Sequence, residues 1–137
     1  MQFHAGRLID HVHLNVADLD KAATFYSAVL EALDLPPGNR SDHAFQADEL
    51  YISRPGPGQH ISKVLLAFQA RDEAMVQRFY QAALRAGGTD NGGPGERSYH
   101  PGYYAAFVFD PDGNNIEAVT HGKETRSAPS VIREPAA

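Results

Sequence analysis

The sequence contains no cysteine and no tryptophan among its 137 residues. The absence of cysteine excludes disulfide bonds, thiolate nucleophiles and sulfur-ligated metal centres. No apolar run approaches the roughly 18 residues that a membrane-spanning helix requires. No signal-peptide core follows the N-terminal methionine. We therefore expect a cytoplasmic protein that does not associate with membranes.

Positive charge is also scarce. The chain has 12 Lys and Arg residues against 17 Asp and Glu residues, which gives a formal net charge of −5. No basic cluster appears anywhere along the chain, so a nucleic-acid partner is not expected. The apolar content of 42% and the charged content of 21% are typical of a folded globular protein. The length fits one domain.

The sequence contains an internal repeat. The segment 25–30, Phe-Tyr-Ser-Ala-Val-Leu, returns 54 residues further along as Phe-Tyr-Gln-Ala-Ala-Leu at 79–84. At the same offset Asp18 corresponds to Asp72, and an apolar alternation at 12–16 corresponds to one at 66–70. Two copies are too few for a solenoid, which needs at least three stacked units. We interpret the repeat as a duplicated module that pairs with itself.

Each copy has the pattern of a strand followed by a helix and further strands. A half-buried strand is predicted over 8–16, because apolar residues at 12, 14 and 16 alternate with polar residues at 11, 13 and 15. Asp18 and Asp72 are suitable N-caps for the two amphipathic helices that follow them. Further strands are expected at 42–47, 48–54, 61–70, 103–109 and 115–121. We expect one domain over 1–121, with module one at about 8–59, module two at about 61–121, and a flexible tail at 122–137.

Three segments together resemble the vicinal oxygen chelate superfamily, which includes glyoxalase I, extradiol dioxygenases, and fosfomycin- and bleomycin-resistance proteins. These segments are Ile9-Asp10-His11-Val12-His13-Leu14-Asn15-Val16, the helix from Asp18 to Leu30, and Phe109-Asp110-Pro111-Asp112-Gly113-Asn114-Asn115-Ile116-Glu117. The stretch from His100 to Glu117 is similar to a glyoxalase-like subgroup of undefined activity. The resemblance covers about residues 8–121.

The resemblance implies an α+β fold in which two paired βαβββ modules form one U-shaped mixed sheet, a cup with helices on its outer face. In enzymes of this family a divalent metal in the cup is chelated by adjacent oxygens of the substrate, and the metal stabilises developing negative charge. Zn, Ni, Mn or Fe would be the expected metal. The family also implies a homodimer.

The resemblance assigns His11 and Glu117 as metal ligands, and Glu117 also as the catalytic proton shuttle. Strand alternation places His11 on the polar face of the first strand, which suits a ligand, although a half-exposed histidine bonded to the backbone is the alternative. Glu117 lies among apolar neighbours in the last strand, and a solvated edge glutamate is the alternative there.

The third ligand is missing from the expected position. The repeat aligns His11 with Leu65, and leucine cannot bind a metal. His60 lies five residues earlier with the opposite strand parity, so it reaches the cup only through a bulge or loop. His13, on the same face as His11, is expected to line the pocket.

Further pocket residues are expected in the last third of the chain. His100, Tyr103 and Tyr104 are candidates for a substrate loop that offers hydrogen bonds and stacking, and a turn followed by two packed tyrosines is the alternative. His100 or His121 is a candidate for completing a metal site, with or without a second subunit. Leu65 is expected to form part of the pocket wall.

Two functions follow from these residues. The first is a metal-assisted lyase, isomerase or transferase that acts on a small, oxygen-rich organic molecule chelated in the cup. The alternative is a metal-free protein that binds or sequesters a small molecule, as bleomycin-resistance members do, and Leu65 favours this alternative. A structural or regulatory dimer with a vestigial cup is a weaker third hypothesis.

Overall fold

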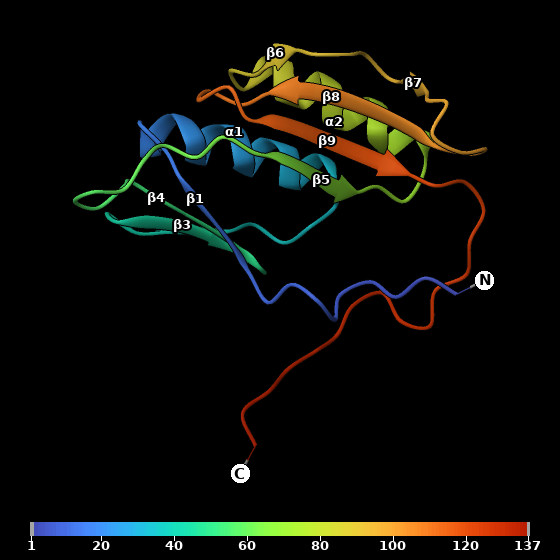
Figure 1. Cartoon of the computed structure of the whole chain (residues 1–137), viewed down its shortest axis with the longest axis horizontal. Coiled ribbons are helices and arrows are strands. Elements are labelled where there is room, and N and C mark those ends of the chain that lie inside the picture. The colour runs from blue at the N-terminus through green and yellow to red at the C-terminus, as the bar shows by residue number, and fades with distance from the viewer. Residues whose placement is uncertain (1, 137) are drawn as a thin grey trace.

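A computed structural model describes residues 2–136 (Figure 1). Its elements are two long helices and nine strands, three of which contain only two residues. In chain order they are β1 Val12–Asn15, α1 Leu19–Ala32, β2 Asn39–Arg40, β3 Ala44–Ala47, β4 Leu50–Ser53, β5 Leu65–Gln69, α2 Glu73–Arg85, β6 Thr89–Asp90, β7 Gly95–Glu96, β8 Tyr104–Phe109 and β9 Asn115–Thr120.

The first half of the chain forms a four-stranded mixed sheet in the order β1-β4-β3-β2. β1 runs parallel to β4, with His13 opposite Tyr51 and Asn15 opposite Ser53. The pairs β3–β4 and β2–β3 are antiparallel. α1 connects the parallel strands β1 and β4 through the crossover that such a pair requires.

The second half repeats this order as β5-β9-β8-β6, with β7 added alongside β8. β5 runs parallel to β9, and β8 is antiparallel to β9. The register places Glu117 of β9 between Ala67 of β5 and Phe107 of β8. The equivalent strand orders confirm that the internal repeat corresponds to a repeated βαβββ unit.

The helix starts follow the sequence prediction. The side chain of Asp18 accepts a hydrogen bond from the Lys21 amide, and the side chain of Asp72 accepts one from the Met75 amide. Each cap satisfies one of the amides that lack a partner inside the first helical turn. The residues after each cap carry an apolar stripe that faces the sheets.

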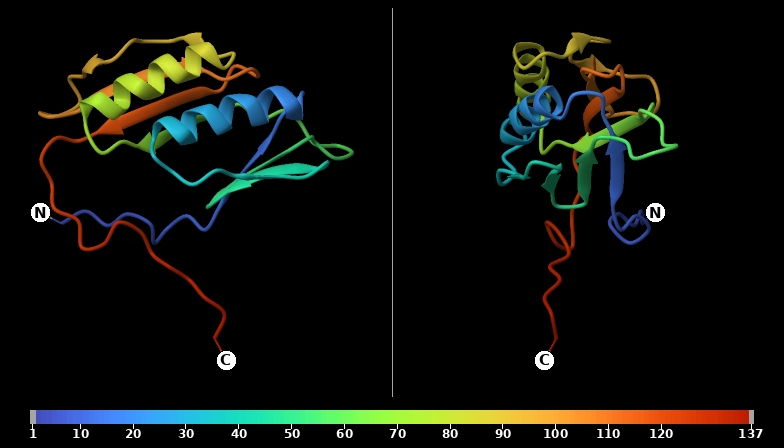
Figure 2. Two further views of the ribbon diagram at one scale, coloured as in Figure 1. Left: turned by 180° about the vertical axis from the view of Figure 1, so that it is seen from behind. Right: turned by 90° about the vertical axis from the view of Figure 1, so that its left-hand side faces the viewer.

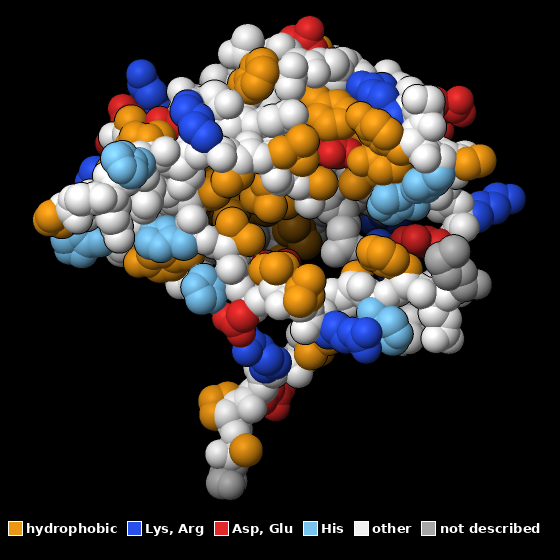
Figure 3. Space-filling model, in the orientation of Figure 1, with side chains coloured by type: hydrophobic (Ala, Val, Ile, Leu, Met, Phe, Trp, Pro, Cys, Tyr) orange, Lys and Arg blue, Asp and Glu red, His pale blue; other side chains and the backbone are white. Residues whose placement is uncertain are grey.

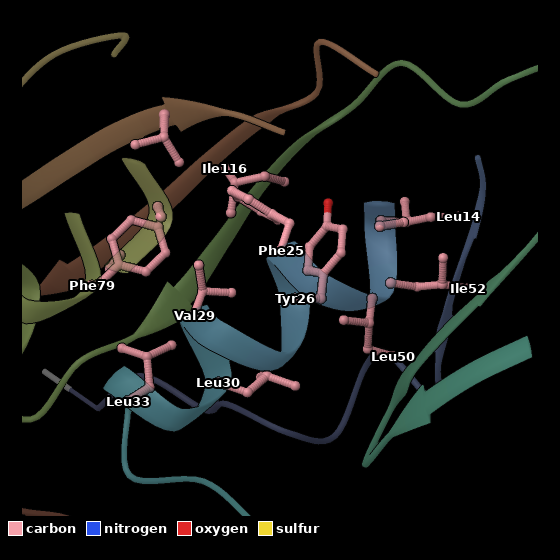
Figure 4. Close-up of a cluster of buried hydrophobic side chains, with 14 of the residues drawn as sticks. Leu14, Phe25, Tyr26, Val29, Leu30, Leu33, Leu50, Ile52, Phe79 and Ile116 are labelled. Atoms are coloured by element: carbon pink, nitrogen blue, oxygen red, sulfur yellow. The ribbon is translucent and has the colours of Figure 1, made fainter. Parts of the chain in front are cut away.

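Both helices lie on the same side of the two sheets and contact each other (Figure 2). The core between the helices and the sheets contains Phe25 and Tyr26 of α1 and Phe79 of α2, all fully buried. Figure 4 shows these rings with Leu14, Ile52 and Ile116 of the surrounding strands. The aromatic pairs of the repeat are therefore packing residues.

Hydrogen bonds join the two halves near the start of β5. The Ser62 amide donates to the Asn15 carbonyl at 2.9 Å, and the Asn15 amide donates to the Ser62 hydroxyl at 2.9 Å. The Ala17 amide donates to the carboxylate of Asp112 at 3.2 Å. These contacts hold β1 beside the segment that leads into β5.

The α+β class and the paired βαβββ units are confirmed, with the backbone hydrogen bonds divided between two open sheets. Two details differ from the prediction. The first strand begins at Val12, so residues 8–11 precede it. The segment after α2, where no strand was expected, contributes β6 and β7 to the edge of β8.

The segments outside the sheets run beside one another. Residues 2–11 and 121–136 contain no helix or strand, and both pass along the same side of the molecule (Figure 1). Arg133 pairs with Asp10 at 3.2 Å between them. Flexibility of the C-terminal tail stays a prediction. Within residues 2–136, no helix combines the length and apolar character needed to cross a membrane.

Candidate ligand-binding cup

The faces of the two sheets that point away from the helices form the inner face of the molecule. Figure 3 shows that this side is hollowed near its centre, where hydrophobic side chains lie deep. Alternation along each strand assigns the side chains of this face. They are His13 and Asn15 of β1, Tyr51 and Ser53 of β4, Leu65, Ala67 and Gln69 of β5, Ala105, Phe107 and Phe109 of β8, and Asn115, Glu117 and Val119 of β9.

Glu117 is the buried acid of the inner face. It is only 3% exposed, and its Oε2 accepts a hydrogen bond from the hydroxyl of Tyr103. Burial, followed by this hydrogen bond and the charge of Glu117, raises the pKa of Tyr103 above its usual range. Tyr103 therefore keeps its proton and remains a donor to the carboxylate at neutral pH.

An aromatic corner surrounds Tyr103. We use this name for Tyr99, His100, Tyr103 and His121. The Tyr99 and Tyr103 rings meet edge to face at 4.9 Å between centroids, and the two histidine rings stack at 5.2 Å. His100 Nε2 and His121 Nδ1 lie 3.0 Å apart and share a hydrogen bond. The structure thus brings His100 and Tyr103, which were predicted to line the pocket, together with Glu117, which was predicted as metal ligand and proton shuttle. These roles stay predictions.

His13 belongs to a second group on the inner face. Its Nε2 is 2.7 Å from the hydroxyl oxygen of Ser53, and its ring meets that of Tyr51 edge to face at 4.9 Å. The register of β1 and β4 places these side chains next to each other. His13 therefore lies on the inner face, where the sequence pattern placed it.

His11 lies before the first strand and is exposed. Its Nδ1 is 2.8 Å from the carboxylate of Asp10. The hydrogen bond from His11, followed by the charge of Arg133, lowers the pKa of Asp10. The contacts of His11 are thus with the N-terminal segment and not with Glu117.

Leu65 lies on the inner face and is 61% exposed. Its partner across the ladder is Asn115 of β9. Its predicted role as part of a pocket wall stays a prediction. His60 is exposed and lies in the irregular segment before β5.

The donor set does not fit the divalent metal that the fold implies. Among residues 2–136, no group of three or more His, Asp or Glu side chains is placed to hold a metal ion. The ladder neighbours of Glu117 are Ala67 and Phe107, and neither carries a ligand atom. Catalytic metals usually take three protein ligands, and the described residues do not gather a set of three around Glu117.

Tyr104 lies on the opposite face of β8 from the other candidate residues. Its hydroxyl accepts a hydrogen bond from the amide of Gln77 on α2 at 3.0 Å, and its ring packs on the core. The pocket role predicted for Tyr104 does not match this placement. Adjacent residues of a strand point to opposite faces, so Tyr103 and Tyr104 cannot both line the hollow.

Sequence reasoning missed two asparagines of the inner face. The side-chain oxygens of Asn15 and Asn115 are enclosed without a hydrogen-bond partner among the described residues. Alternation alone placed both residues on the polar faces of their strands. Their enclosure depends on the strand pairing, which no local pattern in the sequence reveals.

The sequence model described as the Glyoxalase/Bleomycin resistance protein/Dioxygenase superfamily matches residues 8–118. The chain is 30% identical to a crystal structure of a glyoxalase/bleomycin resistance protein from Albidiferax ferrireducens T118, with a TM-score of 0.73, over 82% of this chain and 98% of that one. No curated protein matches the chain significantly.

Two more distant crystal structures share the fold. A glyoxalase-related enzyme from Fulvimarina pelagi is 21% identical, with a TM-score of 0.63, over 89% of this chain and 99% of that one. A glyoxalase/bleomycin resistance protein/dioxygenase family enzyme from Burkholderia phytofirmans PsJN is 20% identical, with a TM-score of 0.62, over 82% and 97%. The chain therefore belongs to the glyoxalase/bleomycin resistance protein/dioxygenase superfamily.

Proposed function

We propose that this protein binds a small organic molecule in its cup without a tightly held metal ion. The observation that carries the proposal is the set of side chains around Glu117. Leu65, Ala67 and Phe107 occupy the inner face on both sides of this acid, and none of them offers a ligand atom. Apolar walls with a few polar groups are typical of small-molecule sites.

The hydrogen-bonding groups of the proposed pocket lie on both sheets. Glu117 belongs to the second sheet, and the aromatic corner lies in the segments just before β8 and just after β9. His13 and Ser53 belong to the first sheet. A ligand between them would contact polar groups on two sides and apolar side chains at the centre. We further propose that residues 8–121 act as one binding domain and that the protein is a homodimer.

The competing function is a metal-assisted lyase, isomerase or transferase with His11 and Glu117 as ligands. It requires a third donor and an approach of His11 to Glu117. The contact of His11 with Asp10 does not support that approach. In the metal-free function Glu117 is a binding group, which needs no partner ligand.

Elemental analysis of protein purified without a metal-affinity tag tests the proposal. After dialysis against Zn, Ni, Mn or Fe(II), we expect far less than one metal ion per chain, with no difference between wild type, His11→Ala and Glu117→Ala. A panel of small organic acids, alcohols and amines, followed by calorimetry in excess EDTA, should yield ligands whose affinity survives chelation. One metal per chain, lost in both variants, would establish the metal-assisted function instead.

A further inference from the structure

Glu117 is a buried acid without a cationic partner. It is 3% exposed, and Tyr103 is its only hydrogen-bond partner among the described residues. None of the ion pairs within residues 2–136 involves it. A buried carboxylate without a compensating charge is costly. A neutral phenol donor stabilises the carboxylate but leaves its charge in place, so a cationic ligand would gain by pairing with it.

The surroundings of Glu117 suit an organic cation better than a metal ion. Its inner-face neighbour on β8 is Phe107, and its neighbour on β5 is Ala67. A metal ion needs several nitrogen, oxygen or sulfur donors. An ammonium ion needs only acceptors for its N–H groups, and it is attracted by the faces of aromatic rings.

Phe107 already contacts a cation of the chain itself. The guanidinium carbon of Arg97 lies 5.3 Å from the centroid of the Phe107 ring. Arg97 is held there by the carbonyl oxygens of Gly93 at 2.9 Å and Gly95 at 3.0 Å. Because these carbonyls fix its guanidinium, Arg97 forms no ion pair with Glu117. The charge of Glu117 is left for a ligand.

We propose that the ligand of the cup is a small organic ammonium ion, paired with Glu117 beside the Phe107 and Tyr103 rings. This inference rests on the proposed metal-free cup and names its ligand class. It replaces the oxygen-rich ligand expected from the family resemblance with a cationic one, because the buried carboxylate of Glu117 has no cationic partner among the described residues.

Three probes that share a benzyl or phenyl ring test the inference: benzylammonium, benzyl alcohol and benzoate. Each is titrated into the full chain at neutral pH in EDTA, and the amide shifts of β9 are followed by NMR. We expect benzylammonium to bind at least tenfold more tightly than benzyl alcohol, and benzoate to bind most weakly. Equal affinities, or no shift of β9 with benzylammonium, would overturn the inference.

Matched variants test whether the charge of Glu117 is responsible for the binding of benzylammonium. Glu117→Gln should weaken benzylammonium binding at least tenfold, whereas Glu31→Gln, on the exposed side of α1, should leave it unchanged. Glu117→Asp keeps the charge and should retain the preference for the cation, which guards against a folding defect in the first variant. An unchanged affinity in folded Glu117→Gln would contradict the proposal.

If benzyl alcohol or benzoate binds as well as benzylammonium in EDTA, the ligand class is wrong but the metal-free cup stands. If every probe binds only after a divalent metal is restored, the metal-free cup itself is wrong.

Discussion

The hydroxyl of Tyr26 on α1 donates a hydrogen bond of 2.6 Å to the carboxylate of Asp110, in the turn between β8 and β9. Both residues are buried. The same carboxylate accepts bonds from the Asp112 and Asn114 amides and from the Asn114 side chain. One helix of the first half is thereby fixed to the turn that positions β9, the strand that carries Glu117.

Tyr26→Phe should destabilise the protein by about 1–3 kcal/mol, because it removes a donor from a buried charged acceptor. Urea denaturation measures this free energy of unfolding. Tyr80→Phe is the matched control from the repeat, since its hydroxyl bonds to the exposed Asp90. We expect a much smaller effect there. Equal losses of unfolding free energy in the two variants would show that the buried contact with Asp110 stabilises the protein no more than the exposed contact with Asp90.

Alkaline pH should destabilise the protein through two tyrosines. Burial is the main cause that raises the pKa of both Tyr26 and Tyr103 above the usual value near 10. Above about pH 10 the unfolded chain releases protons that the folded protein retains, so stability is complete below that pH and falls as pH rises beyond it. Unfolding free energies between neutral pH and pH 11 measure the slope. Tyr26→Phe and Tyr103→Phe should each reduce it, and an unchanged slope in both would refute this account.

Gly88→Ala should cost about 1–3 kcal/mol through overpacking. A Cβ atom at Gly88 would lie 2.8 Å from the Ala83 carbonyl oxygen and 2.8 Å from a ring carbon of Phe25. Thermal unfolding measures the loss. In the control Gly56→Ala, the atom nearest to the added Cβ is the end of the Gln59 side chain at 3.4 Å. The midpoint temperature of thermal unfolding should therefore hardly change in this control. A Gly88→Ala variant as stable as wild type would mean that the Phe25 ring moves aside at little cost.

Leu65→His should increase zinc affinity over wild type. The change places an imidazole on the inner face, two ladder positions from the pair formed by Ala67 and Glu117. Imidazole and carboxylate are both good zinc ligands. Zinc retained after gel filtration, measured by elemental analysis, should rise in this variant, and Leu65→Asn should show no such rise. If Leu65→His retains no more zinc than wild type, position 65 is too far from Glu117 to share a metal.

Short-range sequence patterns predicted the starts of the helices and the polar faces of the strands. Asp18 and Asp72 could be recognised as caps because an acid before an amphipathic stripe satisfies amides of the first turn. The polar faces of the strands were likewise visible in the alternation around His13 and Glu117. The repeated strand–helix–strand pattern followed from these features, whereas the α+β cup was implied by the family resemblance.

The contacts of the candidate site were not predictable in this way, because they join distant segments. The bond between Tyr103 and Glu117 depends on how residues 97–103 return to β8. The separation of His11 from Glu117 depends on where β1 begins. The enclosed oxygen of Asn115 follows from the pairing of β9 with both neighbours. None of these relationships has a local signature in the chain.

The contact between α1 and α2 has a consequence for how the halves depend on each other. Phe25 of α1 and Phe79 of α2 are fully buried, and the two helices contact each other. A half-chain cut in the segment Pro55–Gly58 would expose its helix, so it would have to find another half to be soluble. The linker then acts as a tether that keeps the two complementary fragments at a high effective concentration. In this respect the two halves of the chain behave like two subunits that are joined by a covalent linker.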